Sequence, residues 1–161
     1  MKELFDSEII EFLKLCNEYN VRMLMVGGGA VNLHGYQRHS ADVDFWIEPT
    51  EININRLIPV MKEMGYEIES FPERVIKGKQ NISFKFSPDS FTVELITHYS
   101  SILEFDKAWE RSETHTLGPN KVNRFRVIGL KDLIDTKLKA GRPKDLNDVQ
   151  MLKELNKDNF N

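Results

Sequence analysis

Cysteine is almost absent from this sequence, and long apolar runs are missing altogether. Cys16 is the only cysteine, so the chain can form neither an internal disulfide nor a cysteine-based zinc site. No apolar run approaches the roughly 20 residues that a membrane-spanning helix needs. Charged residues interrupt the N-terminal segment, which therefore does not have the pattern of a signal peptide. We expect a cytoplasmic protein without a membrane segment, in which Cys16 is a small buried side chain.

An excess of positive charge is also missing. The chain has 22 lysines and arginines against 25 aspartates and glutamates, for a net charge of -3. Proteins that coat nucleic acid carry a basic excess, so that class is disfavoured, although a local basic patch is not excluded. Hydrophobic residues make up 40% and charged residues 29% of the 161 residues. These proportions are usual for a globular protein and predict one domain over residues 1–161.

Hydrophobic spacing predicts a mixture of helices and strands. An N-terminal helix is expected after a Ser7 cap, and another over 52–64 after a Thr50 cap. Alternating or short apolar runs predict strands at 21–26, 43–47, 66–71, 82–86, 91–96, 114–117 and 122–127. The remaining predictions are a two-turn helix after residues 27–29, an exposed turn at 74–80, a short helix within 102–109, and helices over 130–140 and from 144 or 145. This order predicts an α+β domain with a mixed β-sheet flanked by helices and with C-terminal helices.

Three acidic residues stand out on the predicted strands. Asp42 and Asp44 are one residue apart on a strand, so their side chains point to the same face and repel one another. Glu94 lies between apolar residues on a later strand, where a carboxylate needs a partner. Each acid alone also fits a solvated position on a strand. Together they predict a site for magnesium or manganese, which bind carboxylate oxygens.

A run of three glycines precedes these acids. Gly27–Gly29 follow a buried strand and precede a helix, so their backbone N–H groups could surround a phosphate. A tight turn that requires positive φ is the alternative explanation. The spacing matches neither the dinucleotide-binding fingerprint nor the P-loop.

The combination of these motifs resembles the DNA polymerase beta-type nucleotidyltransferase superfamily. The likeness is to its small bacterial members, which include abortive-infection toxins and antibiotic nucleotidyltransferases, and it extends over roughly residues 21–152. The sequence departs from the usual pattern at two positions, with Gly29 where serine is common and Glu94 where aspartate is common. The matching residues are Gly27–Ala30, His34–Gly35, Arg38, Ser40, Asp42–Asp44, Glu94, Leu130–Lys137 and Gly141–Asp148.

The resemblance implies metal ligands and a catalytic base. Asp42, Asp44 and Glu94 would hold the metal ions, and Glu94 could also accept the proton of the attacking hydroxyl. A nucleoside monophosphate would pass from a nucleoside triphosphate such as ATP to that hydroxyl, and pyrophosphate would leave. Catalysis would come mainly from positioning and charge neutralisation.

The resemblance also implies phosphate-binding residues. Gly27 and Gly28 would surround the β and γ phosphates, and Arg38 and Lys137 would supply positive charge. Ser40 would hydrogen-bond a phosphate or turn the chain.

Further polar residues near the C-terminus have simpler interpretations. Asp145 and Asp148 are first interpreted as helix-capping residues. Arg142 and Lys144 are interpreted as part of a solvated loop, although they could meet an acidic substrate.

The acceptor and the biological role remain open at the level of sequence. The acceptor could be a transfer RNA end, a protein or a small molecule such as an antibiotic. The protein could also be the toxin of a toxin–antitoxin pair, with an antitoxin as its partner. A non-catalytic, nucleotide-binding regulatory module is the alternative, but the three acids favour an enzyme.

Overall fold

The computed structural model describes residues 5–117 and 123–159. Its centre is a six-stranded sheet with the order β3-β4-β2-β1-β6-β5. The strands are β1 (Met23–Val26), β2 (Asp42–Ile47), β3 (Ile82–Phe84), β4 (Thr92–Ile96), β5 (Glu113–Leu117) and β6 (Asn123–Val127). The pairs β2–β4 and β1–β6 are parallel and the other neighbours are antiparallel. The predicted α+β class with a mixed sheet is therefore confirmed.

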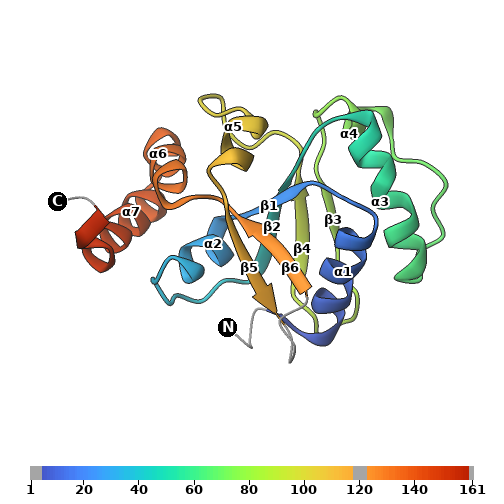
Figure 1. Cartoon of the computed structure of the whole chain (residues 1–161), viewed down its shortest axis with the longest axis horizontal. Coiled ribbons are helices and arrows are strands. Elements are labelled where there is room, and N and C mark those ends of the chain that lie inside the picture. The colour runs from blue at the N-terminus through green and yellow to red at the C-terminus, as the bar shows by residue number, and fades with distance from the viewer. Residues whose placement is uncertain (1–4, 118–122, 160–161) are drawn as a thin grey trace.

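Helices flank this sheet. They are α1 (Ser7–Glu18), α2 (Gly27–Leu33), α3 (Glu51–Glu63), α4 (Glu73–Ile76), α5 (Phe105–Glu110), α6 (Leu130–Ala140) and α7 (Pro143–Leu155), followed by the 3-10 turn η1 (Lys157–Asn159). Figure 1 shows α3 and α4 at one end of the molecule and α6 and α7 at the other, with the sheet between them. Within the described ranges, none of the helices has the length and apolar character needed to cross a membrane.

Side chains alternate between the two faces of each strand, and the buried ones form the core. Val43, Phe45 and Ile47 of β2 are fully buried on one face, as the alternating pattern predicts. Helix α1 contributes Phe12, which packs edge-on against Phe84 at a centroid distance of 5.4 Å. Cys16 on the same helix is 2% exposed, which confirms its buried role.

The two predicted helix caps differ in outcome. Thr50 caps α3 as expected, since its side chain accepts a hydrogen bond from the Asn53 N–H at 3.2 Å. Ser7 does not cap α1. Asp6 takes that place and accepts from the N–H groups of Glu8 and Ile9 at 3.1 and 2.9 Å. A carboxylate interacts more strongly than a hydroxyl with the positive end of the helix, so the helix begins one residue earlier than predicted.

Several predicted segments need correction. Residues 66–71 form no strand, because no described strand of the sheet pairs with them. The Tyr66 ring lies 6.2 Å from that of Phe84, and its hydroxyl donates to the Lys85 carbonyl. Residues 74–80, predicted as a turn, include part of α4. Helix α2 begins at Gly27, so the glycines form its first turn and not a loop before it. The strands predicted at 114–117 and 122–127 are present as β5 and β6, which pair with each other in antiparallel register, while residues 118–122 between them lie outside the described residues.

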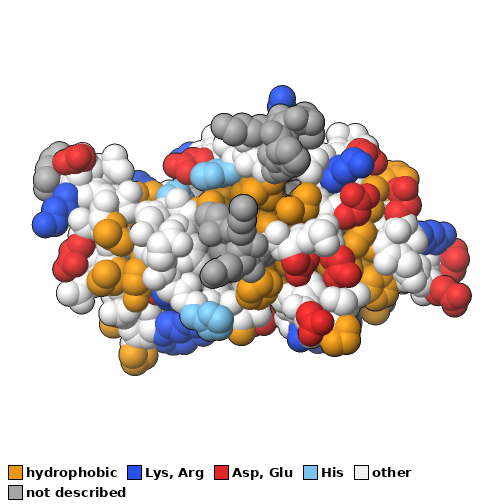
Figure 2. All heavy atoms as spheres, turned by 90° about the horizontal axis from the view of Figure 1, so that it is seen from below, with side chains coloured by type: hydrophobic (Ala, Val, Ile, Leu, Met, Phe, Trp, Pro, Cys, Tyr) orange, Lys and Arg blue, Asp and Glu red, His pale blue; other side chains and the backbone are white. Residues whose placement is uncertain are grey.

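Figure 2 presents the face seen from below the view of Figure 1. Lysine and arginine side chains are interspersed there with aspartate and glutamate, and hydrophobic side chains lie between them. The described residues visible on this face therefore form no broad basic patch of the kind that a nucleic-acid coating protein presents.

Candidate functional site

The parallel pairing of β2 and β4 brings the three predicted acids together. Asp44 lies directly opposite Glu94 in the register, and Asp42 lies two residues before Asp44 on the same face. One carboxylate oxygen from each of the three residues lies within 4.8 Å of the other two. Oxygens bound to one magnesium ion at about 2.1 Å lie about 3 to 4 Å apart, so a small movement would suffice to share an ion.

The electrostatics of this acidic triad are unfavourable without a cation. The pKa of the Asp44 carboxyl is raised to about 6, first because Asp44 is partly buried and then because Glu94 and Asp42 lie nearby. The positive charges of Lys144 and Lys137 oppose this shift more weakly. The donor set is made only of carboxylate oxygens, which is the chemistry that magnesium and manganese prefer. The residues present therefore fit a divalent metal ion.

A neighbouring amide orients one of the acids. The Asn81 side chain donates a hydrogen bond to Glu94 Oε1 at 3.3 Å. Asn81 also accepts from the Thr97 N–H at 3.1 Å, so its position is tied to the end of β4. Sequence reasoning did not single out Asn81, because a single asparagine before a short strand carries no pattern.

The glycines lie directly against the acids. Val26 pairs with Asp44 in the antiparallel register of β1 and β2, which places Gly27 beside that carboxylate. Gly27 has a left-handed φ of +62°, and a Cβ atom there would lie only 2.4 Å from Asp44 Oδ2. The positive φ of the alternative explanation, a tight turn, is thus present at Gly27, and the close approach of a carboxylate is a second reason for glycine there.

The second glycine is constrained by the linker between α2 and β2. A Cβ atom at Gly28 would lie 2.5 Å from Ser40 Oγ and 3.4 Å from Arg38 Nη1. Ser40 donates a hydrogen bond to the Asp42 carbonyl at 2.9 Å, which holds the linker against the start of β2. The structure therefore brings Gly27, Gly28 and Ser40 to the acidic triad, while their contact with phosphate stays a prediction.

Arg38 and Lys137 converge on one buried carboxylate. Arg38 donates from Nε and Nη2 to the two oxygens of Asp148 at 2.9 and 3.0 Å. Lys137 Nζ lies 2.8 Å from Asp148 Oδ2 and 3.5 Å from Asp145 Oδ1. Asp148 is 0% exposed, so this network joins the linker before β2 to α6 and α7.

The interpretation of the C-terminal acids as caps is only half correct. Asp145 does cap α7, because it accepts from the Arg142 N–H at 3.3 Å. Burial alone would raise the pKa of Asp145, but the Arg142 hydrogen bond and the Lys137 charge hold it below its usual value. Asp148 is no cap but the buried partner of two cations. Its spacing with Val149 and Leu152 places it on the buried side of α7, and that spacing was the available signal.

The sheet order, the glycine-containing start of α2 and the acidic triad on β2 and β4 define a nucleotidyltransferase fold. The sequence model of the DUF6036 family, described as nucleotidyltransferases of unknown function, matches residues 3–159. Since the match covers nearly the whole chain, the protein belongs to this family, and the resemblance to nucleotidyltransferases is confirmed. A comparison with curated proteins found no match.

Proposed function

We propose that this protein is a metal-dependent nucleotidyltransferase that moves a nucleoside monophosphate from a nucleoside triphosphate to a hydroxyl acceptor. The observation that carries the proposal is the convergence of Asp42, Asp44 and Glu94 beside Gly27. Within residues 5–117 and 123–159, no lysine or arginine nitrogen lies within 4.0 Å of these three carboxylates. Like charges held together without a close counter-ion are costly, and a divalent cation removes that cost.

The acids have distinct roles in this proposal. Asp42, Asp44 and Glu94 would hold magnesium or manganese, and the bound metal would stabilise negative charge on the transferring phosphate and on the departing pyrophosphate. Glu94 would accept the proton of the acceptor hydroxyl. The acceptor oxygen then forms its bond to the α phosphorus as the bond from that phosphorus to pyrophosphate breaks.

The phosphate-binding part of the proposal uses the glycines and the cations beside them. The backbone at Gly27 and Gly28 would bind the β and γ phosphates, and Ser40 would assist. Arg38, which lies beside Gly28, and Lys137 would supply positive charge. Asp148 fixes both cations in place, so their side chains do not have to be ordered when the triphosphate binds.

The acceptor is proposed by class. A transfer RNA end, a protein and a small molecule such as an antibiotic each offer a suitable hydroxyl. The net charge of -3 disfavours a long nucleic-acid contact, although it permits a short one. A role as the toxin of a toxin–antitoxin pair belongs to this proposal, and the genes beside this one would test it.

The proposal is tested by metal-dependent pyrophosphate release. The purified protein is mixed with each triphosphate, with magnesium or manganese, and with one acceptor class at a time. Activity should fall at least about 100-fold in an Asp42→Asn/Asp44→Asn variant, because both metal ligands are weakened. Asp89→Asn serves as the matched control, since Asp89 is exposed and lies outside the triad.

Thermal or urea unfolding with metal and triphosphate distinguishes a protein that binds nucleotide without turnover from one that does not bind it. At 100 times its Kd, the metal–triphosphate pair should stabilise the fold by about 2.7 kcal/mol, and the double variant should lose this gain. Stabilisation without turnover by any acceptor would favour the non-catalytic regulatory module. If neither metal nor triphosphate stabilised the fold, the proposed site would be wrong.

A further inference from the structure

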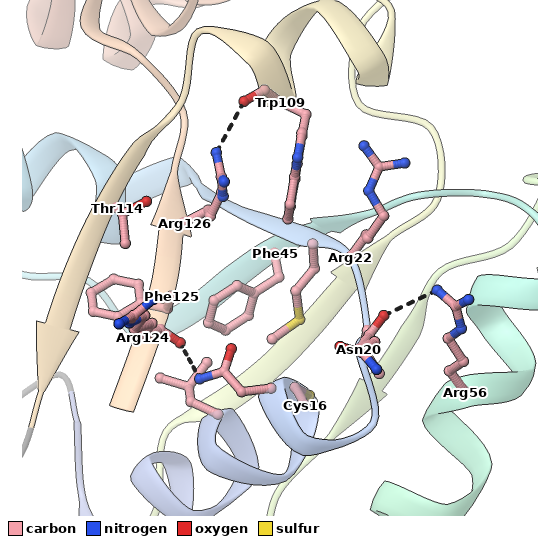
Figure 3. A pocket seen from close by; sticks show the side chains of 14 residues that line it. Cys16, Asn20, Arg22, Phe45, Arg56, Trp109, Thr114, Arg124, Phe125 and Arg126 are labelled. Atoms are coloured by element: carbon pink, nitrogen blue, oxygen red, sulfur yellow. Dashed lines mark hydrogen bonds between the residues drawn. The ribbon is translucent and has the colours of Figure 1, made fainter. Parts of the chain in front are cut away.

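A second cavity, of about 400 Å³, lies where the parallel strands β1 and β6 separate (Figure 3). Their register contains only the pairs Leu24–Arg126 and Met25–Val127. The residues just before these pairs, Met23 on β1 and Phe125 on β6, do not pair with each other and line the cavity. Helix α1 closes one side, where Asn17 Nδ2 donates to the Arg124 carbonyl at 2.6 Å. The Asn17 side chain thus hydrogen-bonds a β6 carbonyl at the point where β1 and β6 no longer pair.

This cavity has no residue in common with the acidic triad or its phosphate-binding neighbours. Phe45 lines it, and since Phe45 alternates with Asp44 along β2, its side chain lies on the face of the sheet opposite the triad, as does that of Phe125. Arg124 and Arg126 alternate with Phe125 along β6, so their side chains start from the other face and reach the cavity at the gap between β1 and β6. The inner wall is apolar and includes Cys16, Met23 and Phe125. A ligand that enters must therefore carry an apolar or aromatic part.

The rim of the cavity is strongly basic. Among the residues that the structure describes, four arginines and no acidic residue belong to the lining. Arg22 is neutralised by Glu48. In the described part of the chain, no carboxylate lies within 4.0 Å of the guanidinium nitrogens of Arg56, Arg124 or Arg126. In a chain of net negative charge, this concentration of unpaired arginines indicates an anionic ligand.

One of these arginines is held in place before any ligand arrives. The guanidinium carbon of Arg126 lies 4.3 Å from the centroid of the Trp109 ring, and Arg22 lies 4.7 Å from the same ring. Arg126 also donates from Nη1 to Ser112 Oγ at 3.1 Å. Figure 3 shows Trp109 and Arg126 side by side among the residues that line the cavity. A fixed guanidinium loses little entropy when it binds a phosphate.

Polar groups at the same rim remain available for recognition. Among the described residues, neither the Asn20 side-chain amide nor the Thr114 hydroxyl takes part in a hydrogen bond, and both line the cavity. An amide and a hydroxyl are suited to the edge of a heterocyclic base. The cavity volume falls in the range of small-molecule sites.

We propose that this cavity is a second, metal-independent site for a free nucleoside phosphate, separate from the proposed catalytic site. The base packs on the apolar wall formed by Phe45 and Phe125. The phosphate pairs with Arg124 and Arg126, whose guanidinium groups can each donate two hydrogen bonds.

The test uses nucleoside monophosphates in the presence of EDTA, so that the acidic triad holds no metal. Calorimetric titration of the whole protein with AMP or GMP should show one site. Arg124→Gln and Arg126→Gln should each weaken binding about tenfold, which is the loss of one charge-assisted contact. Arg74→Gln is the matched control, because Arg74 is exposed, lies outside the cavity and should leave binding unchanged.

A second measurement does not depend on variants. The protein has two tryptophans, and the indole N–H signal of Trp109 should move on titration while that of Trp46 stays in place. The Asp42→Asn/Asp44→Asn variant should bind the monophosphate as well as the original protein does, which keeps this test independent of the catalytic proposal.

Four results would overturn the inference. They are the absence of binding by either monophosphate at millimolar concentration, equal binding of inorganic phosphate, loss of binding in the Asp42→Asn/Asp44→Asn variant, and tenfold tighter binding of a short oligoribonucleotide. The last result would assign the cavity to RNA instead of a free nucleotide.

Discussion

Replacing Asp148 with asparagine removes a buried carboxylate that contacts both Arg38 and Lys137. The Asp148 side chain is 1% exposed, and those of Arg38 and Lys137 are 15% and 9% exposed. Removing one partner of a buried ion pair costs about 3 to 5 kcal/mol, because the remaining charge is left uncompensated. Asparagine keeps a neutral acceptor, and Lys137 keeps Asp145 at 3.5 Å. We therefore expect the lower value, about 3 kcal/mol.

Urea unfolding at pH 7 without metal measures this loss directly. The midpoint should fall while the slope stays constant, because the area exposed on unfolding does not change. In thermal unfolding, a loss of about 3 kcal/mol corresponds to a decrease of about 6 to 12 °C in Tm for a chain of this size.

Asp135→Asn is the matched control. Asp135 also pairs with a lysine at 2.9 Å, but the side chains of Lys131 and Asp135 are 83% and 43% exposed. Exposed pairs contribute about 0 to 1 kcal/mol, so Asp135→Asn should lower the free energy of unfolding by at most about 1 kcal/mol. If Asp148→Asn and Asp135→Asn destabilised the protein equally, burial would not be the source of the effect. The reasoning would also fail if Arg38→Gln and Asp148→Asn showed no coupling in a double-mutant cycle.

Two further predictions concern the acids and the glycine beside them. Gly27→Ala should destabilise the protein by about 1 kcal/mol more than Gly141→Ala in urea unfolding, and should also weaken metal binding. Both glycines have a left-handed φ, +62° and +66°, but only at Gly27 would a Cβ atom meet the Asp44 carboxylate, at 2.4 Å. If both variants lost the same free energy of unfolding, this contact would be unimportant. Because the pKa of Asp44 is raised from 3.8 to about 6, its contribution to the stability of the metal-free protein should be fully present below about pH 4 and be lost as the pH rises through 6. Metal affinity should rise over the same range, since a proton must leave, and an Asp44→Asn variant that kept the full pH dependence would contradict this assignment.

Local pattern was sufficient for most of the secondary structure. The alternation of apolar residues marked β2, β3 and β4, and the helical spacing with Gly141 as a stop gave the bounds of α6 without error. The apolar spacing and the stop residue lie within a few positions of one another, so both can be recognised from the sequence alone. Errors occurred at caps and in irregular segments such as 66–71, where an apolar pattern is present but no described strand of the sheet pairs with the segment.

In the candidate site, too, one part follows from local pattern and another depends on the pairing of strands. Asp42 and Asp44 had to share a face, because the side chains of a strand alternate with a period of two. That Glu94 lies opposite Asp44 depends on the parallel pairing of β2 and β4, which no local pattern specifies. The sequence therefore determined which acids were available, and the sheet order decided that they meet.

The buried ion network shows the limit of sequence most clearly. The spacing of α7 determines that Asp148 lies on its buried side, but its partner Arg38 is 110 residues away along the chain. Only the packing of α6 and α7 against the linker before β2 brings the two together. Periodicity is a property of neighbouring residues, whereas the partner of a buried charge is set by contacts between distant segments, and tertiary structure alone supplies those.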